Sequence, residues 1–98
     1  MVMCNVLEVK ISRMFKTSYK KVSRDKKYKQ ETFDYVIFML ASQIALPEKY
    51  RDHALTGAHK DKRECHLAPD LLLIYKIEEG YLTLTLLNIR NHNSVFRK

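Results

Sequence analysis

Residues 71–89, LLLIYKIEEGYLTLTLLNI, decide the fold of this 98-residue chain. The first part, Leu71–Ile77, is a continuous apolar run, which is typical of a central strand covered on both faces. Residues 78–80 are expected to form a hairpin turn. Tyr81–Ile89 alternates leucines with threonines, which indicates a strand with one buried face. These residues therefore predict two neighbouring antiparallel strands.

The chain on the N-terminal side of this hairpin adds two further strands and two helices. Strand-like alternation marks residues 6–11 and 62–67. Ser12 is a candidate helix N-cap, and apolar spacings of three and four predict one helix after it and a second from Tyr28 to Ala45. Residues 46–60 are expected to form an irregular loop. The predicted class is α+β, in the order β-α-α-β-β-β, with a helical hairpin packed on a mostly antiparallel four-stranded sheet.

The composition indicates one globular domain over residues 1–98. The chain is 46% hydrophobic and 30% charged, which favours a folded protein over a disordered one. The longest apolar run is Leu71–Tyr75, so no membrane-spanning helix is expected, and the first residues lack the pattern of a signal peptide. Two cysteines, Cys4 and Cys65, are too few for a disulfide scaffold and indicate reduced thiols in a cytosolic protein.

The positive charge is concentrated in one segment. The net charge is +7, while residues 10–29 carry nine lysines and arginines against a single acidic residue, Asp25. Lys16, Lys20 and Arg24 lie four residues apart, which places them on one stripe of the first helix. Such a field favours nucleic acid or an acidic protein as a partner, and a solvated helix face is the alternative.

The chain has four histidines, His53, His59, His66 and His92, all in its second half. Histidine suits both proton transfers of metal-independent RNA cleavage, and a lysine or arginine can stabilise the phosphorane. Three alternatives remain open: four surface histidines without a joint role, a zinc site that includes Cys65, and a nucleophilic Cys65. Zinc lacks the usual ligand spacing, and alternation places Cys65 on the apolar face of its strand.

A series of short motifs runs from residue 46 onward. They are Leu46-Pro47, YRDHAL at residues 50–55, Gly57, RECHLAPD at residues 63–70, LIY at residues 73–75 and a final His92-x3-Phe96. Together the motifs resemble those of the YafQ-type toxins of bacterial type II toxin–antitoxin systems, within the RelE superfamily. The preceding β-α-α order with its basic helices also suits that family.

The resemblance implies a function. It implies an endoribonuclease that cleaves messenger RNA in the ribosomal A site by acid–base chemistry, with no metal or other cofactor. It also implies a cytoplasmic bacterial protein with no membrane partner, which contacts ribosomal RNA and is neutralised by an acidic antitoxin. Operator DNA would be bound only through the antitoxin. A non-catalytic module of the same fold, which binds RNA, the ribosome or the antitoxin, is the alternative.

The resemblance also assigns roles by position. His53, His66, Asp70 and His92 match active-site residues of the family. His66 or His92 is expected to act as general acid or base with His53 assisting, while Asp70 orients a histidine. His59 stands where related sequences often carry a tryptophan, so it is either an extra active-site group or a surface residue. The expected substrate contacts are Arg63 and Arg90 at the scissile phosphate, Phe96 on a base, and Lys16, Lys20 and Arg24 on ribosomal RNA.

Overall fold

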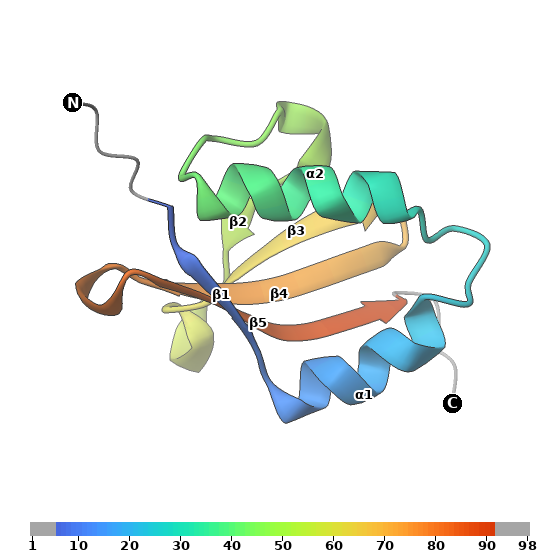
Figure 1. The fold of residues 1–98 in the computed structure, drawn as a ribbon, viewed down its shortest axis with the longest axis horizontal. Helices are drawn as coiled ribbons and strands as arrows, with labels where there is room; N and C mark the ends of the chain where they lie inside the picture. The colour runs from blue at the N-terminus through green and yellow to red at the C-terminus, as the bar shows by residue number, and fades with distance from the viewer. Residues whose placement is uncertain (1–5, 92–98) are drawn as a thin grey trace.

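Two helices pack against one face of a five-stranded sheet in the computed structural model, which describes residues 6–91 (Figure 1). The strand order is β1-β5-β4-β3-β2, with β1 parallel to β5 and every other neighbouring pair antiparallel. This arrangement confirms the predicted α+β class with helices on a mostly antiparallel sheet. The strands are β1 (Glu8–Ile11), β2 (His53–Ala54), β3 (Arg63–Ala68), β4 (Leu71–Glu78) and β5 (Thr83–Asn91).

The sheet has one strand more than the four predicted. The additional strand is β2, which is two residues long and pairs with Glu64 and Arg63 at one edge of the sheet. Three 3₁₀ turns, η1 (Glu48–Tyr50), η2 (Gly57–His59) and η3 (Glu79–Tyr81), complete the segments between strands. The prediction that β5 begins at Tyr81 was wrong, because Leu82 adopts a left-handed backbone (φ 51°) and the strand starts at Thr83. The other strand bounds agree with the prediction to within two residues.

The first helix, α1 (Arg13–Val22), begins where the sequence predicts. The Ser12 hydroxyl accepts a hydrogen bond from the Phe15 amide at 3.0 Å and donates one to the Leu87 carbonyl at 2.7 Å. The second helix, α2 (Gln30–Ala41), is shorter than the predicted span from Tyr28 to Ala45. It ends early because Gln43 takes a left-handed conformation (φ 59°), so the following residues leave the helix axis.

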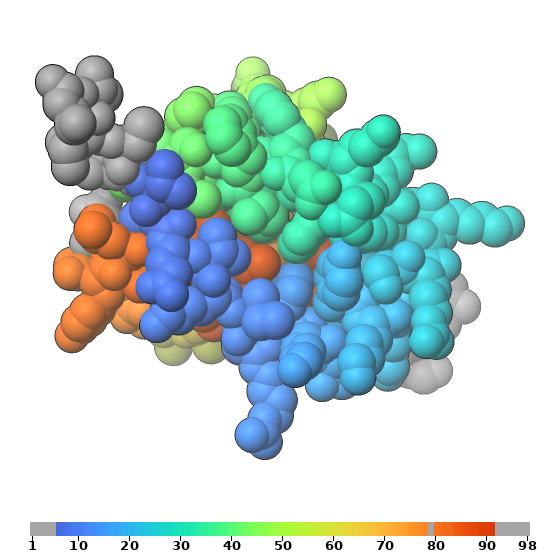
Figure 2. All heavy atoms as spheres, viewed as in Figure 1, coloured from blue at the N-terminus to red at the C-terminus, as the bar shows by residue number. Residues whose placement is uncertain are grey.

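The core lies between the helices and the sheet. The helices meet each other through aromatic rings, including Phe15 and Phe33 with centroids 6.2 Å apart. In the all-atom view from the same side, the helices cover most of the sheet (Figure 2). None of the described helices is long and apolar enough to cross a membrane. The buried side chains beneath the helices include Phe15, Val22, Val36, Leu40, Cys65, Leu73, Tyr75, Leu84, Leu86 and Ile89.

Candidate active site on the open face of the sheet

Strand β3 directs alternate side chains to the two faces of the sheet. Cys65 is fully buried in the core beneath the helices, so its neighbours Glu64 and His66 point to the opposite, open face. The register of the neighbouring strands shows which of their residues share this open face. His53 of β2 is paired with Glu64, while His66 is paired with Leu72, which is itself paired with Arg90 of β5. Three strands, β2, β3 and β5, therefore bring two histidines, a carboxylate and a guanidinium to one face.

Glu64 is the centre of this cluster. One oxygen of its carboxylate lies 3.3 Å from Nε2 of His53, and the other lies 3.9 Å from Nη2 of Arg90. The side chain of Glu64 is only 13% exposed, so both contacts are shielded more than an ordinary surface pair. The rings of His53 and His66 are 6.4 Å apart between centroids. That separation leaves both imidazoles within reach of one group the size of a phosphate.

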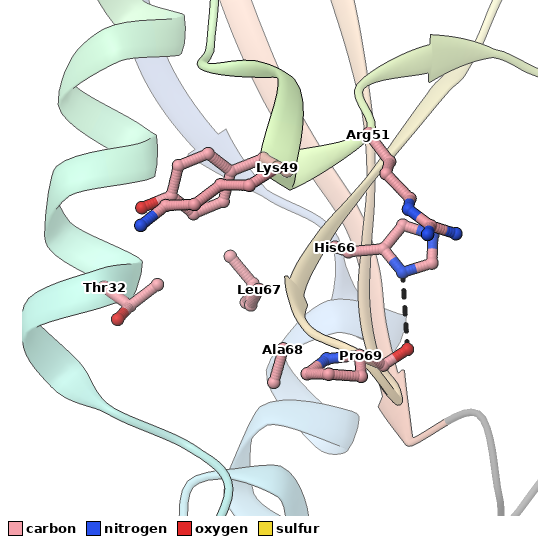
Figure 3. A pocket seen from close by; sticks show the side chains of 8 residues that line it. Thr32, Lys49, Arg51, His66, Leu67, Ala68 and Pro69 are labelled. Carbon is pink, nitrogen blue, oxygen red and sulfur yellow. Dashed lines mark hydrogen bonds between the residues drawn. The ribbon is translucent and has the colours of Figure 1, made fainter.

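The two imidazoles have different hydrogen-bonding surroundings. Nδ1 of His53 lies 2.6 Å from the Arg51 carbonyl, which can only accept, so this nitrogen carries a hydrogen. Nε2 of the same ring faces the Glu64 carboxylate, so a protonated His53 donates from both nitrogens. Nδ1 of His66 lies 3.4 Å from the Pro69 carbonyl, which leaves Nε2 of a neutral His66 as an acceptor (Figure 3). The geometry thus favours a proton donor at His53 and a proton acceptor at His66.

A polar cluster on the covered face anchors the short strand that carries His53. The Tyr75 hydroxyl donates a hydrogen bond to Asp52, and Arg63 donates to both carboxylate oxygens of Asp52 at 3.3 and 3.4 Å. Burial, and then the hydrogen-bonded Asp52 carboxylate, raises the pKa of Tyr75 above its ordinary value of 10.0. Because Asp52 directly precedes His53, this cluster holds β2 against the sheet and positions the His53 ring.

The model of the family described as "Bacterial toxin of type II toxin-antitoxin system, YafQ" matches residues 7–97 of the sequence. The chain belongs to this YafQ family. The match covers nearly the whole chain, well beyond the motifs that first suggested the resemblance.

Two individual YafQ proteins are also similar to this chain in sequence. A Haemophilus influenzae protein that carries the YafQ name is 40% identical over 63 residues, which is 60% of this chain and 62% of the relative. The "mRNA interferase toxin YafQ" of Escherichia coli K12 is 39% identical over 44 residues, 45% of this chain and 48% of the relative. The aligned part thus spans less than two thirds of each relative.

Solved structures of similar proteins extend the likeness to the fold. A metal-bound toxin from Helicobacter pylori is 37% identical with a TM-score of 0.82, and the match covers 92% of this chain and 99% of that one. The E. coli DinJ-YafQ toxin-antitoxin complex contains a chain that is 25% identical with a TM-score of 0.77, matched over 93% of this chain and 98% of that one. Both agree with helices packed on a mostly antiparallel sheet.

The structure groups some of the predicted YafQ-type site residues and separates others. It brings His53, His66 and Arg90 together on the open face through Glu64. It places Arg63 on the covered face against Asp52, away from the phosphate position that the sequence suggested. Asp70 lies at the β3–β4 turn with its carboxylate 3.2 Å from Lys27. Two predicted site residues, His92 and Phe96, lie outside the described residues.

The remaining candidates have simpler surroundings. His59 is exposed in η2, with Lys62 3.4 Å from its Nδ1 atom. Burial, and then the Asp52 and Glu64 carboxylates, raises the pKa of the Cys65 thiol to about 12, so the thiol stays protonated and unreactive at neutral pH. Over residues 6–91, no three His, Cys, Asp or Glu side chains are placed to share a metal ion. Lys16 and Lys20 of α1 are exposed, and so is Arg24, which lies beyond the end of the helix and not on its surface as the spacing predicted.

Sequence reasoning missed two contributions to the site. Glu64 stood in the sequence as a motif residue, whereas the structure places it against His53 of the strand that was not predicted. Asp52 and Tyr75 were seen only as motif residues, although they anchor that strand. The alternation of β3 does contain a usable signal, since Arg63 has the same parity as the buried Cys65 and opposes that of Glu64 and His66.

Proposed function

We propose that this chain is the toxin of a type II toxin–antitoxin pair and that it cleaves messenger RNA in the ribosomal A site. Family membership supports this proposal, as does the "mRNA interferase" name of the E. coli relative. The single observation that carries it is the His53–Glu64–His66 cluster, in which two imidazoles with opposite hydrogen-bonding roles face one open surface.

The proposed reaction is attack of the ribose 2′-oxygen on the adjacent phosphorus. Nε2 of His66 takes the 2′-hydroxyl proton, and the 2′-oxygen bonds to phosphorus as the bond to the 5′-oxygen breaks. The departing 5′-oxygen takes the place of the Glu64 oxygen beside Nε2–H of His53 and receives this proton, which leaves a cyclic 2′,3′-phosphate and a free 5′-hydroxyl. Glu64 orients His53, while Asp70 keeps its predicted role of orienting a histidine. His92 and Asp70 remain predicted active-site residues.

Two further surfaces suit the proposed partners. The exposed cations Lys16 and Lys20 of α1, and Arg24 just after it, offer an electrostatic contact for ribosomal RNA. An acidic antitoxin complements the same charge, and the DinJ-YafQ complex shows that a structural relative assembles with an antitoxin. In this proposal the toxin acts in the bacterial cytoplasm and reaches operator DNA only through the antitoxin.

Primer extension on a defined messenger in purified translating ribosomes tests the proposal. Wild type should produce discrete A-site cuts, and His53→Asn should slow cutting by about 100-fold because the proton donor is lost. The matched control is His59→Asn, the same change at an exposed histidine in η2, which should cut like wild type. Added cognate antitoxin should abolish the cuts. A folded wild type that binds ribosomes without cutting would instead identify a non-catalytic module.

A further inference from the structure

A pocket of about 390 Å³ opens at the edge of β3, beside His66 (Figure 3). Within the described chain, β2 pairs only with Arg63 and Glu64, so the rest of β3 is left without a neighbouring strand on that side. The pocket occupies this position. Its walls are Thr32 of α2, residues 49–51 at the end of η1, and residues 66–69 of β3 and the following turn.

The lining of this pocket is cationic. Lys49 and Arg51 contribute two positive charges, and none of the described residues that line the pocket carries a carboxylate. Among the described residues, neither of these cations is within ion-pair distance of a carboxylate, whereas Arg63 and Arg90 both are. Tyr50 adds an aromatic ring, with the Lys49 ammonium 5.3 Å from its centroid. Cations without an internal counter-ion beside an aromatic ring suit a phosphate attached to a base.

The backbone of Arg51 fixes where its side chain is presented. Arg51 adopts a left-handed conformation (φ 49°), which is uncommon for a residue with a side chain. Its amide donates to the Glu48 carbonyl at 2.9 Å, and its own carbonyl lies 2.6 Å from Nδ1 of His53. This geometry aims the guanidinium alongside the His66 ring, while Lys49 lies on the other side of the strand edge (Figure 3). One backbone turn therefore positions both His53 and Arg51.

We propose that this pocket binds the nucleotide beside the scissile bond of a single-stranded RNA. The guanidinium of Arg51 contacts the phosphate on which His66 acts, and Lys49 and Tyr50 contact the neighbouring nucleotide. Arg51 thus takes the phosphate-binding role that the sequence had assigned to Arg63 or Arg90. The inference rests on the proposed ribonuclease function, because it identifies part of the substrate site for that reaction.

The test uses the intact chain with four substitutions. Arg51→Gly removes the guanidinium at a position where glycine adopts the observed backbone without strain, so folding should be retained. Arg51→Lys keeps the charge, and Lys49→Ala removes the second cation. Lys60→Ala is the matched control, since it removes one positive charge from an exposed residue outside the pocket. Thermal melting of each variant verifies that it folds.

Two readouts are measured on these variants. The first is the salt dependence of binding to a short single-stranded RNA with 2′-O-methyl riboses, which cannot be cleaved. Arg51→Gly should reduce the slope of log affinity against log salt by about 0.7, the value expected for one lost phosphate contact. Lys49→Ala should reduce it similarly. Arg51→Lys keeps the cation and Lys60→Ala changes a residue outside the pocket, so both should keep a slope near that of wild type. The second readout is cleavage on ribosomes, which Arg51→Gly should slow by about 100-fold.

The outcomes separate this inference from the proposed function. If wild type cuts and Arg51→Gly behaves like Lys60→Ala in both readouts, the pocket is not a substrate site although the enzyme is a ribonuclease. A wild type that fails to bind the RNA also overturns the pocket assignment. If wild type does not cut, but Arg51→Gly still weakens RNA binding and flattens its salt dependence, the pocket is an RNA site and the catalytic proposal is wrong.

Discussion

The covered and open faces of the sheet use alternate residues of the same strand, β3, in different ways. On the covered face, Arg63 is tied to Asp52 and Tyr75, and Cys65 is fully buried. On the open face, Glu64 and His66 keep partial exposure, and their neighbours are an imidazole, a guanidinium and a backbone carbonyl. The comparison shows that a step of one residue along β3 leads from buried packing contacts to the candidate catalytic cluster on the open face.

The two faces are nevertheless connected through β2. This strand has only two residues, too few to be stable through its own ladder, and the Asp52 cluster on the covered face holds it in place. His53 follows Asp52 and emerges on the open face beside Glu64. The covered face therefore determines where one of the proposed catalytic groups lies.

Replacing Tyr75 by alanine should have the largest effect on stability. Tyr75 is 1% exposed, so Tyr75→Ala leaves a cavity in the core and should lower the free energy of unfolding by about 3–5 kcal/mol. Tyr81 is 81% exposed, and Tyr81→Ala should change stability by less than about 0.5 kcal/mol. Denaturant unfolding of the two variants measures this difference. Equal losses of unfolding free energy in the two variants would show that Tyr75 does not stabilise the covered face.

Tyr75→Phe isolates the hydrogen bond to Asp52 from the packing of the ring. Removing the hydroxyl leaves the half-buried Asp52 carboxylate with one donor fewer and should cost about 1–3 kcal/mol. If Asp52 anchors β2, hydrogen exchange at the amides of residues 52–54 should also become faster than in wild type. A destabilised variant in which these amides keep their protection would break the proposed link between the two faces.

Alkaline pH should weaken the covered face through the same tyrosine. The fold favours the neutral phenol of Tyr75, so its contribution is complete below the unfolded pKa near 10 and is lost as the pH rises above it. At about pH 11 the loss relative to neutral pH should be about 1.4 kcal/mol. Tyr75→Phe is the control, because it retains every other alkaline titration. If the stability–pH curves of wild type and Tyr75→Phe ran parallel, the alkaline loss of stability would not come from Tyr75.

Glu64→Gln should have the smallest effect, and the effect should fall on activity. The change removes the charge that pairs with His53 and Arg90, which for a shielded but not buried pair is worth about 1 kcal/mol, or about a fivefold slower cleavage. Stability should fall by no more than about 1 kcal/mol, because the same two pairs are lost from the folded state. Cleavage rates on ribosomes and denaturant unfolding test both statements. If the variant lost stability and kept its cleavage rate, Glu64 would stabilise the fold and would not act in the reaction.

Most of the fold follows from local sequence signals. The hairpin of residues 71–89 combines a continuous apolar run with strict alternation, and the Ser12 cap marks the start of α1 without ambiguity. Strand β2 could not be found in this way, because two residues show no periodicity and their place depends on side-chain contacts to Asp52. The early end of α2 depends on the left-handed backbone of Gln43, a residue type that does not require that conformation.

The sequence predicted which residues belong to the candidate site better than it predicted the contacts between them. The motif carried His53 and His66, and the structure places their rings together. The pairing of His53 with Glu64 depends on the register of the missed strand, and the exposed position of Arg51 depends on a left-handed turn with no glycine to mark it. Arg63 lies on the covered face against Asp52, a position that its parity with Cys65 indicates and its motif position does not.

The most direct test compares His66→Asn with Cys65→Ala, two neighbouring changes on opposite faces of β3. Each variant is assayed for cleavage on translating ribosomes and for its free energy of unfolding. We expect His66→Asn to slow cleavage by about 100-fold or more and to change stability by less than about 0.5 kcal/mol. Cys65→Ala should lose about 1 kcal/mol of stability and keep the wild-type cleavage rate. Two results would contradict the division between the two faces. One is a cleavage rate that falls only in proportion to the loss of stability in both variants, and the other is a His66→Asn variant that cleaves like wild type.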